Sequence, residues 1–186
     1  MRRLIVFNNV TLDGFIADAK GDMSWAHNQD AEWNDFVMSN AQGGAEFVFG
    51  RITYELMAGF WPTLPAIESM PVVANRMNRS PKYVFSTTMR EAAWSNTRLF
   101  KGDPAGEIRK LKAESGPDLV IFGSGTIVSQ LTQARLIDEY QLVIHSVALG
   151  AGKPQFAGIG EHLKLKLLKS RVFGNGNVLA CYGPEE

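Results

Sequence analysis

The chain has 186 residues, 45% of them hydrophobic, and its 19 basic and 19 acidic side chains cancel. A neutral chain lacks the positive excess that nucleic acids and anionic membranes attract, so we exclude both as partners. Cys181 is the only cysteine, which excludes an internal disulfide and a zinc site of four cysteines. We expect a single cytoplasmic domain over residues 1–186 without a metal centre, because no signal-peptide pattern, long apolar run or metal motif is present.

Short runs rich in β-branched and aromatic residues alternate with helical patterns through residue 134. The strands predicted in this part are residues 3–8, 46–49, 82–87 and 118–122. The helices predicted between and after them are residues 30–41, 71–79, 107–114 and 126–134, with one more that carries the i,i+4 pair Ile52 and Leu56 and ends at Gly59. Asp30 is expected to cap the first helix, and Asp103, just before Pro104, to cap the fourth.

Three β-like segments close the chain, at residues 140–149, 163–172 and 177–182. The stretch LKLKLLK in the second alternates at its start, which predicts one solvent-facing side. Strands that alternate with helices indicate an α/β fold with a mainly parallel sheet covered on both faces. Consecutive strands at the end indicate an antiparallel edge. In such folds ligands bind beyond the carboxyl ends of the parallel strands.

The first strand end with notable chemistry is VFGRITYEL, residues 48–56. Gly50 lets the backbone approach a ligand, and Arg51 presents a five-donor fork that suits phosphate oxygens. Thr53 would lie in the first helical turn, where unpaired N–H groups favour an anion. The alternative is an ordinary tight turn with a solvated arginine.

The second strand end, YVFSTTMR, places the hydroxyls of Ser86, Thr87 and Thr88 after a strand, with Arg90 following. A strand end that binds the ribose of NAD usually supplies an acidic residue to the 2′-hydroxyl. Hydroxylic and basic residues suit a ribose 2′-phosphate instead. The alternative is a polar loop that caps a helix.

The third strand end is LVIFGSGTIV, in which Gly123 and Gly125 flank Ser124 and Thr126 opens a helix. Two glycines would expose backbone N–H groups to a diphosphate. Val128 stands where a Rossmann fingerprint expects glycine or alanine, so tight packing of a helix on a strand is the alternative. Taken together, the three strand ends predict a site for a dinucleotide that carries an additional phosphate.

Six stretches resemble, in order and spacing, the dihydrofolate reductase-like superfamily, and above all its branch with the riboflavin-biosynthesis reductase domain. They are VTLDGFIA (10–17), FGRITYE (49–55), PKYVFSTT (81–88), FGSGTIVSQL (122–131), LIDEYQL (136–142) and VALGAGKPQF (147–156). The resemblance implies a three-layer α/β sandwich with a mainly parallel central sheet, an antiparallel C-terminal edge and flanking helices. It also implies that the protein binds NADPH.

Motif by motif, the resemblance implies NADPH contacts at the three strand ends and beside the first strand. Asn9, Ile16 and Ala17 would border the nicotinamide, while Ser86 and Thr87 would meet the 2′-phosphate. The full set of candidate cofactor contacts is Asn9, Ile16, Ala17, Gly50, Arg51, Thr53, Ser86, Thr87, Thr88, Phe122, Gly123, Ser124, Gly125, Thr126 and Ile127.

A buried carboxyl with a raised pKa is the group that would bind or protonate a nitrogen heterocycle. Glu32 is one candidate, because Trp25 before it and Phe36 four residues after it resemble the acid-bearing segment of dihydrofolate reductase. Trp33 departs from that pattern, and its bulk would narrow a pterin site. The alternative for Glu32 is an acid in a first helical turn that favours the helix dipole.

Asp13 is the second candidate, because TLDGF resembles the riboflavin-branch motif near the substrate, where Thr11 is a further contact. An Asp-Gly turn is the alternative. Lys153 in LGAGKPQF is a candidate substrate contact, or else a solvated hairpin lysine. His145 is interpreted as a strand histidine with a satisfied side chain.

The sequence therefore predicts an NADPH-dependent reductase that transfers a hydride to a pyrimidine- or pterin-like heterocycle. The nearest activity is that of 5-amino-6-(5-phosphoribosylamino)uracil reductase of riboflavin biosynthesis. The alternatives are a true dihydrofolate reductase and a non-catalytic module that binds or senses NADPH. The resemblance to the riboflavin branch also implies a homodimer. Because a long edge strand needs to be covered, we predict that this homodimer forms through the terminal strands.

Overall fold

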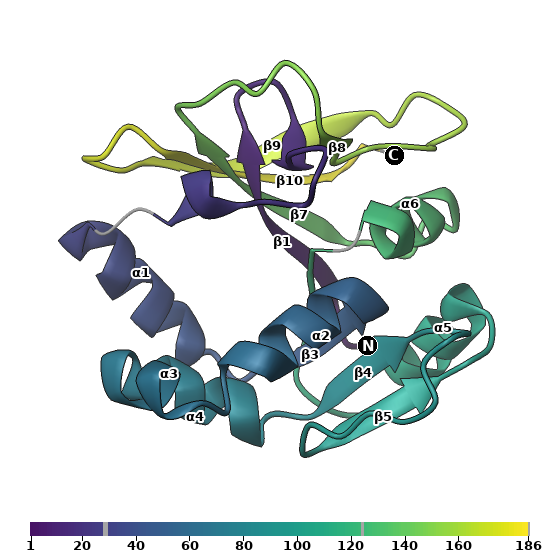
Figure 1. The fold of residues 1–186 in the computed structure, drawn as a ribbon. Coiled ribbons are helices and arrows are strands. Elements are labelled where there is room, and N and C mark those ends of the chain that lie inside the picture. Colours follow the sequence, from purple (N-terminus) through teal and green to yellow (C-terminus); the bar gives the residue numbers. More distant parts are fainter. Residues whose placement is uncertain (28–29, 124, 186) are drawn as a thin grey trace.

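The computed structural model describes residues 1–27, 30–123 and 125–185 (Figure 1). Its main sheet has eight strands in the order β5-β4-β3-β6-β1-β7-β10-β9. These are β1 (Leu4–Thr11), β3 (Glu46–Gly50), β4 (Lys82–Phe85), β5 (Thr97–Phe100), β6 (Leu119–Phe122), β7 (Glu139–His145), β9 (Leu165–Val172) and β10 (Val178–Pro184). Neighbours from β5 to β7 pair in parallel, whereas β10 pairs antiparallel with both β7 and β9. The predicted mainly parallel sheet with an antiparallel edge is confirmed.

The helices are α1 (Ala31–Ala41), α2 (Arg51–Phe60), α3 (Leu64–Ser69), α4 (Pro71–Arg79), α5 (Pro104–Ala113), α6 (Gly125–Gln133) and the short 3-10 helix η1 (Ser24–Ala26). Both predicted caps are confirmed: the Asp30 carboxylate accepts from Trp33 N, and the Asp103 carboxylate accepts from Ala105 N and Gly106 N. No helix in the described ranges is both long and apolar enough to cross a membrane.

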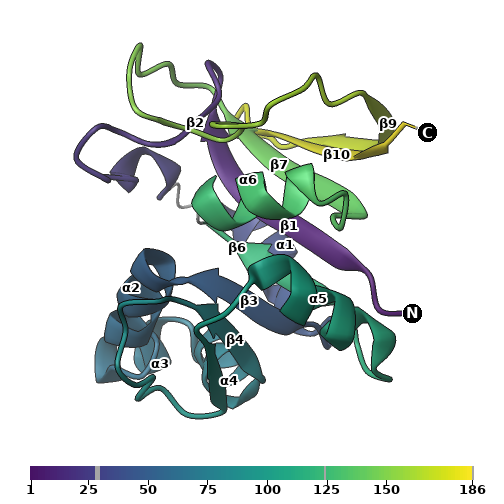
Figure 2. The same ribbon diagram turned by 90° about the vertical axis from the view of Figure 1, so that its right-hand side faces the viewer.

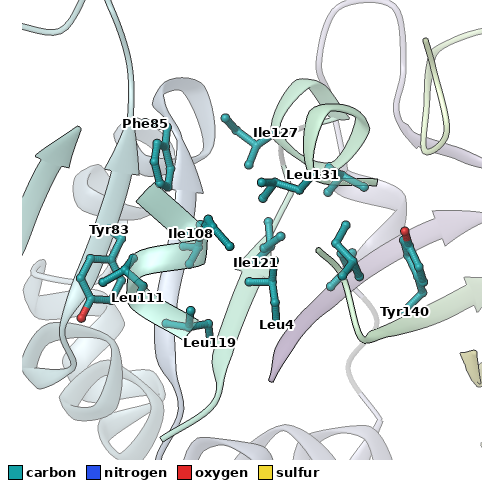
Figure 3. Close-up of a cluster of buried hydrophobic side chains, with 14 of the residues drawn as sticks. Leu4, Tyr83, Phe85, Ile108, Leu111, Leu119, Ile121, Ile127, Leu131 and Tyr140 are labelled. Atoms are coloured by element: carbon teal, nitrogen blue, oxygen red, sulfur yellow. The ribbon is translucent and has the colours of Figure 1, made fainter. Parts of the chain in front are cut away.

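Helices cover both faces of the sheet, as the three-layer prediction requires. Figure 2 shows α5 and α6 in front of the strands β1 and β6. Because side chains alternate across a strand, Leu4 and Val6 of β1 face these helices and pack with Ile108 of α5 and Leu131 of α6 (Figure 3). On the other face, Phe49 packs with α2 and α4 residues, and a second aromatic cluster joins α1 to β10.

Several predictions of local structure are wrong. Gly59 does not end its helix, because α2 continues through Phe60. The pair Ile52 and Leu56 lies on this helix as predicted, and both side chains are exposed. Tyr54 is the residue of α2 that packs into the core, because it meets the ring of Phe49. The strand predicted at 140–149 stops at His145.

The edge strand β9 also departs from expectation, because nearly all of it is exposed rather than one side only. The sequence patterns did not predict η1, α3, β5 or the two-stranded sheet of β2 (Phe15–Ala17) and β8 (Lys153–Pro154). Segments of two to six residues carry too few turns of a helix or alternations of a strand to show a period.

Candidate functional site

The predicted strand ends lie side by side in the sheet. Because β4, β3 and β6 are adjacent and parallel, their carboxyl ends meet at one edge, next to the ends of β1 and β7. Three segments that lie about 35 residues apart in the sequence therefore border one site.

The N-terminus of α2 provides an anion-binding geometry at the end of β3. Gly50 is its N-cap residue and supplies no side-chain hydrogen bond, so the first-turn N–H groups lack the cap that Asp30 gives α1. Arg51 is the first residue of this helix, and its Nη1 donates to Glu55 Oε2 at 2.8 Å. A phosphate bound by Arg51 would compete with Glu55 for the guanidinium.

The turn after β6 touches the start of α2. Gly123 has φ +64°, and a Cβ on it would lie 2.6 Å from Thr53 Oγ1, so only glycine fits there. Gly123 N donates to Asn8 Oδ1 at 2.8 Å. This contradicts the expectation that both glycines offer N–H groups to a diphosphate, because Asn8 already binds that of Gly123. Ser124 lies outside the described residues.

The rest of this turn leads into α6. Thr126 is exposed at the start of the helix and Ile127 is buried. A Cβ on Gly125 would come within 3.7 Å of Ile16 Cδ1 and 3.6 Å of Pro154 O, so β2 and β8 pack against this turn. Phe122 packs against other aromatic rings, with its centroid 5.3 Å from that of Phe47. That ring is part of the core, which argues against a direct cofactor contact.

The end of β4 forms a hydroxyl-rich turn. Ser86 Oγ accepts from Thr88 N at 3.2 Å and Met89 N at 3.0 Å, which is the local turn that serine side chains favour. Thr87 and Thr88 are exposed. Of the three hydroxyls, that of Ser86 organises the loop and lies 3.4 Å from that of Thr88, which is exposed, as is that of Thr87.

Asp13 links two loops and does not have the properties of a proton donor. Its carboxylate accepts from Thr11 Oγ1 at 2.6 Å, Leu149 N at 3.0 Å and Gly150 N at 2.7 Å. The hydrogen bond from Thr11, then that from Gly150, lowers the pKa of Asp13, although the side chain is exposed. The expectation of a buried carboxyl with a raised pKa is wrong for Asp13. Thr11 is itself buried and also accepts from Phe15 N, so its hydroxyl is engaged within the loop.

Glu32 is not a buried carboxyl with a raised pKa either. Its Oε1 accepts from Arg171 Nη2 at 2.8 Å and its Oε2 accepts from Gly174 N at 2.8 Å. The Arg171 guanidinium is the main cause that lowers the pKa of Glu32, and the carboxylate is exposed. Glu32 thereby fixes the start of α1 to the β9–β10 hairpin. Neither candidate carboxylate is suited to deliver a proton in this structure.

Aromatic rings surround His145, the last residue of β7 and the only buried histidine among the described residues. The rings of Trp25 and His145 meet edge to face at 5.3 Å, and Trp33 lies behind them against Phe36 at 5.4 Å. His145 Nε2 lies 3.0 Å from Asn9 Oδ1, and burial lowers the pKa of His145. This confirms that His145 has a satisfied side chain.

Two further predicted positions lie on the β2–β8 side. Ala17 is buried on β2, beside Ile16. Lys153 is exposed on β8, with its Nζ 3.1 Å from the place of a Cβ on Gly21, so the ammonium lies over that turn. Among the described residues, Lys153 forms no ion pair.

Sequence reasoning missed Asn8, Gln155 and Glu55. Asn8 donates through Nδ2 to Gln155 Oε1 at 2.6 Å, and both side chains are buried. One signal was available for Asn8: it lies on the same face of β1 as Leu4, Val6 and Val10, where a polar residue is unusual. Glu55 was detectable too, because it lies four residues after Arg51 on one helix.

The sheet order and the residues at its carboxyl edge define an α/β protein of the dihydrofolate reductase-like class, as the sequence predicted. The particular family follows from the comparisons with known proteins. The chain belongs to the RibD C-terminal domain family, whose profile matches residues 2–179. Two proteins of Bacillus subtilis (strain 168) are similar to it. The uncharacterized protein YyaP is 31% identical over 97% of this chain and 94% of its own length, and the uncharacterized protein YwjB is 27% identical over 93% of each.

Solved structures are similar to this chain in fold. A candidate riboflavin biosynthesis protein from Shewanella sp. PV-4 superposes with a TM-score of 0.75 at 25% identity, covering 99% of both chains. The deaminase/5-amino-6-(5-phosphoribosylamino)uracil reductase of Thermotoga maritima superposes with a TM-score of 0.69 at 17% identity. This chain covers 57% of that longer protein, so the likeness concerns the fold of one part of it.

Proposed function

We propose that the protein is an NADPH-dependent reductase that transfers a hydride to a pyrimidine- or pterin-like heterocycle. The observation that carries the proposal is the adjacency of the β4, β3 and β6 ends, which place hydroxyls, an uncapped helix N-terminus and a glycine turn on one edge. Membership of the RibD C-terminal domain family and the uracil reductase among the structural neighbours support the nearest activity, reduction of an aminouracil ribosyl phosphate.

The chemistry of the residues at this end of the sheet supports the assignment of NADPH. Arg51 and the first-turn N–H groups of α2 would hold phosphate, and Thr87 and Thr88 would complete the 2′-phosphate site. The glycine at 123 allows the backbone of this turn to lie close to Thr53, at the start of α2. When bound, the cofactor supplies the hydride, and the protein orients both reactants and excludes water.

The substrate would lie over the ends of β1 and β7, beside Asn9 and Trp25. Asn9 Oδ1 is bound to His145, so its Nδ2 is the group left to donate to a ring carbonyl or nitrogen. Asp13 and Glu32 act here as the anchors of the surrounding loops. Phe36 and Lys153 remain candidate substrate contacts, the first through its ring and the second through its charge.

An NADPH-oxidation assay with purified protein tests the proposal, with the aminouracil ribosyl phosphate and dihydrofolate as substrates in parallel. We expect turnover with the aminouracil. Turnover with dihydrofolate alone would favour a true dihydrofolate reductase. Binding of NADPH without either reaction would favour the sensing module, and absence of NADPH binding would overturn the cofactor assignment.

We further propose that two copies associate through β9. This strand is the last in the sheet order, so in the described residues its outer edge pairs with no other strand. Leu167, Leu168 and Val172 on it are 57%, 50% and 72% exposed, which is a large apolar surface for an edge strand. Sedimentation at micromolar concentration is expected to give a dimer that Val172→Lys weakens. A monomeric wild type would contradict the proposal.

A further inference from the structure

Two buried amide side chains connect the substrate-side loops to the turn after β6. Asn8 and Gln155 are only 4% and 2% exposed, and neither is among the candidate cofactor or substrate contacts. Asn8 Oδ1 accepts from Gly123 N at 2.8 Å, while Asn8 Nδ2 donates to Gln155 Oε1 at 2.6 Å. The direction of this chain of bonds is determined by Gly123, because a backbone N–H can only donate.

The backbone around Gln155 extends the connection further. Gln155 N donates to Gly14 O at 2.9 Å, which ties it to the Asp13-Gly14 turn. Pro154 O lies 3.6 Å from the place of a Cβ on Gly125, so the residue before Gln155 touches the turn itself. Asn8 and Gln155 therefore join both sides of the candidate site.

Gln155 has no other polar side-chain contact within the part of the chain that the structure describes. Its Nε2 is buried and meets no acceptor there. A leucine or methionine would fill the same volume without burying an amide, so what the glutamine contributes is the hydrogen bond that its Oε1 accepts from Asn8 Nδ2.

On the basis of the proposed function, we propose that Asn8 and Gln155 are positioning residues that hold the Gly123 turn in its cofactor-binding shape. Gln155 fixes the Asn8 amide, and Asn8 fixes the Gly123 N–H while Thr53 closes the other side of the glycine. The turn borders the part of a dinucleotide that NADPH and NADH share. The effect of these residues on binding is therefore equal for the two nucleotides.

Three variants and a control test the proposal: Asn8→Leu, Gln155→Met, the double variant and Thr132→Val. Thr132 is buried and bonds to Tyr140 OH, so its loss perturbs the core at the amino end of β7 and not the turn. Hydrogen exchange at the Gly123 amide is measured first, without nucleotide. We expect faster exchange in Asn8→Leu and Gln155→Met, and no change in Thr132→Val.

Dissociation constants for NADPH and NADH are measured next. Asn8→Leu should weaken both about tenfold and Gln155→Met less, with the double variant no worse than Asn8→Leu because the two act in series. Unchanged exchange in Gln155→Met, or additive losses in the double variant, would overturn the proposal. If the wild type binds neither nucleotide, the proposed function fails, and the exchange data alone decide whether the two residues hold the turn.

Discussion

The two ends of the parallel strands differ in how their polar side chains are paired. At the amino end charged groups are bound by partners from other elements. Lys82, fully buried at the start of β4, donates to the carbonyls of Asn78, Ser80 and Ser95. Arg2 pairs with Glu46, which also accepts from Tyr83 OH at 2.7 Å.

At the carboxyl end the chain offers glycines, exposed hydroxyls and an arginine whose partner is only a neighbour on the same helix. The two carboxylates there are bound by backbone N–H groups. The contrast indicates that the side chains of the amino end stabilise the fold, whereas those of the carboxyl end are free to serve the ligand site that we propose there. Each prediction below changes one end, and the expected effect is on stability for the amino end and on the nucleotide for the carboxyl end.

The largest effect is expected from Glu46→Ala, at the amino end. The Arg2 side chain is only 3% exposed, so it would be left charged and unpaired in the protein interior. We expect a loss of about 3 kcal/mol in the free energy of unfolding, measured by urea denaturation. Glu107→Ala removes an exposed pair on α5 and should cost less than about 0.5 kcal/mol.

Nucleotide affinity should be unaffected by Glu46→Ala in the fraction that is folded. A folded variant that no longer binds NADPH would show that the two ends are not separable.

The second effect is at the carboxyl end, in Gly123→Ala. A Cβ there meets Thr53 Oγ1, so the turn must shift, and we expect NADPH oxidation to fall about 100-fold. Gly44→Ala is the matched control, because Gly44 has φ +80° with nothing within 4 Å of a Cβ. Both variants carry the strain of a left-handed alanine. Equal loss of activity in the two would mean that the contact with Thr53 has no role.

A third, smaller effect is expected from Arg51→Ala. Loss of the guanidinium should raise the dissociation constant for NADPH about tenfold while that for NADH changes little. Arg109→Ala on the exposed side of α5 removes the same charge away from the site and should leave both unchanged.

Glu55→Gln changes the same site in the opposite direction, because it frees Arg51 from its ion pair. We expect tighter NADPH binding, by about twofold.

An equal loss for both nucleotides in Arg51→Ala would assign that arginine to the shared phosphates instead.

Local patterns predicted the helices and strands well, because helix caps and strands depend on residues that are neighbours in the sequence. Asp30 and Asp103 were recognisable as caps from the helical residues that follow them, and the strands from their β-branched runs. Gly59 misled because glycine, although favoured after a helix, is tolerated within an exposed last turn. Ile52 and Leu56 indicated the helix correctly, but an apolar pair at helical spacing does not show whether a partner covers it, and both side chains are exposed.

The candidate site was predicted only in part, because its contacts join distant segments. The strand ends were visible, but the partner of Asp13 lies 136 residues away at Leu149, and that of Glu32 lies 139 residues away at Arg171. No local pattern reports such pairs, so two anchoring carboxylates resembled catalytic ones. Asn8 shows what was detectable, a polar residue at a buried position of a strand.

The last prediction is a pH dependence at the amino end, and it tests whether Lys82 is a buried charge. Burial lowers the pKa of Lys82 to about 8, against 10.5 for an ordinary lysine. Between these values the unfolded chain binds more protons than the folded one, so the free energy of unfolding rises with pH. From pH 8 to 9 the rise is about 1 kcal/mol.

Lys82→Met removes this contribution and should give a flatter curve over the same interval. Burial raises the pKa of Cys181 and of Tyr83, so these groups lower stability as pH rises through 9 and 10, in both proteins alike. The difference between wild type and variant therefore isolates Lys82. Identical curves would mean that the three carbonyls hold an ammonium whose charge is not penalised by burial. NADPH affinity should follow neither curve, because Lys82 begins β4 while the residues that we propose for the 2′-phosphate follow its end.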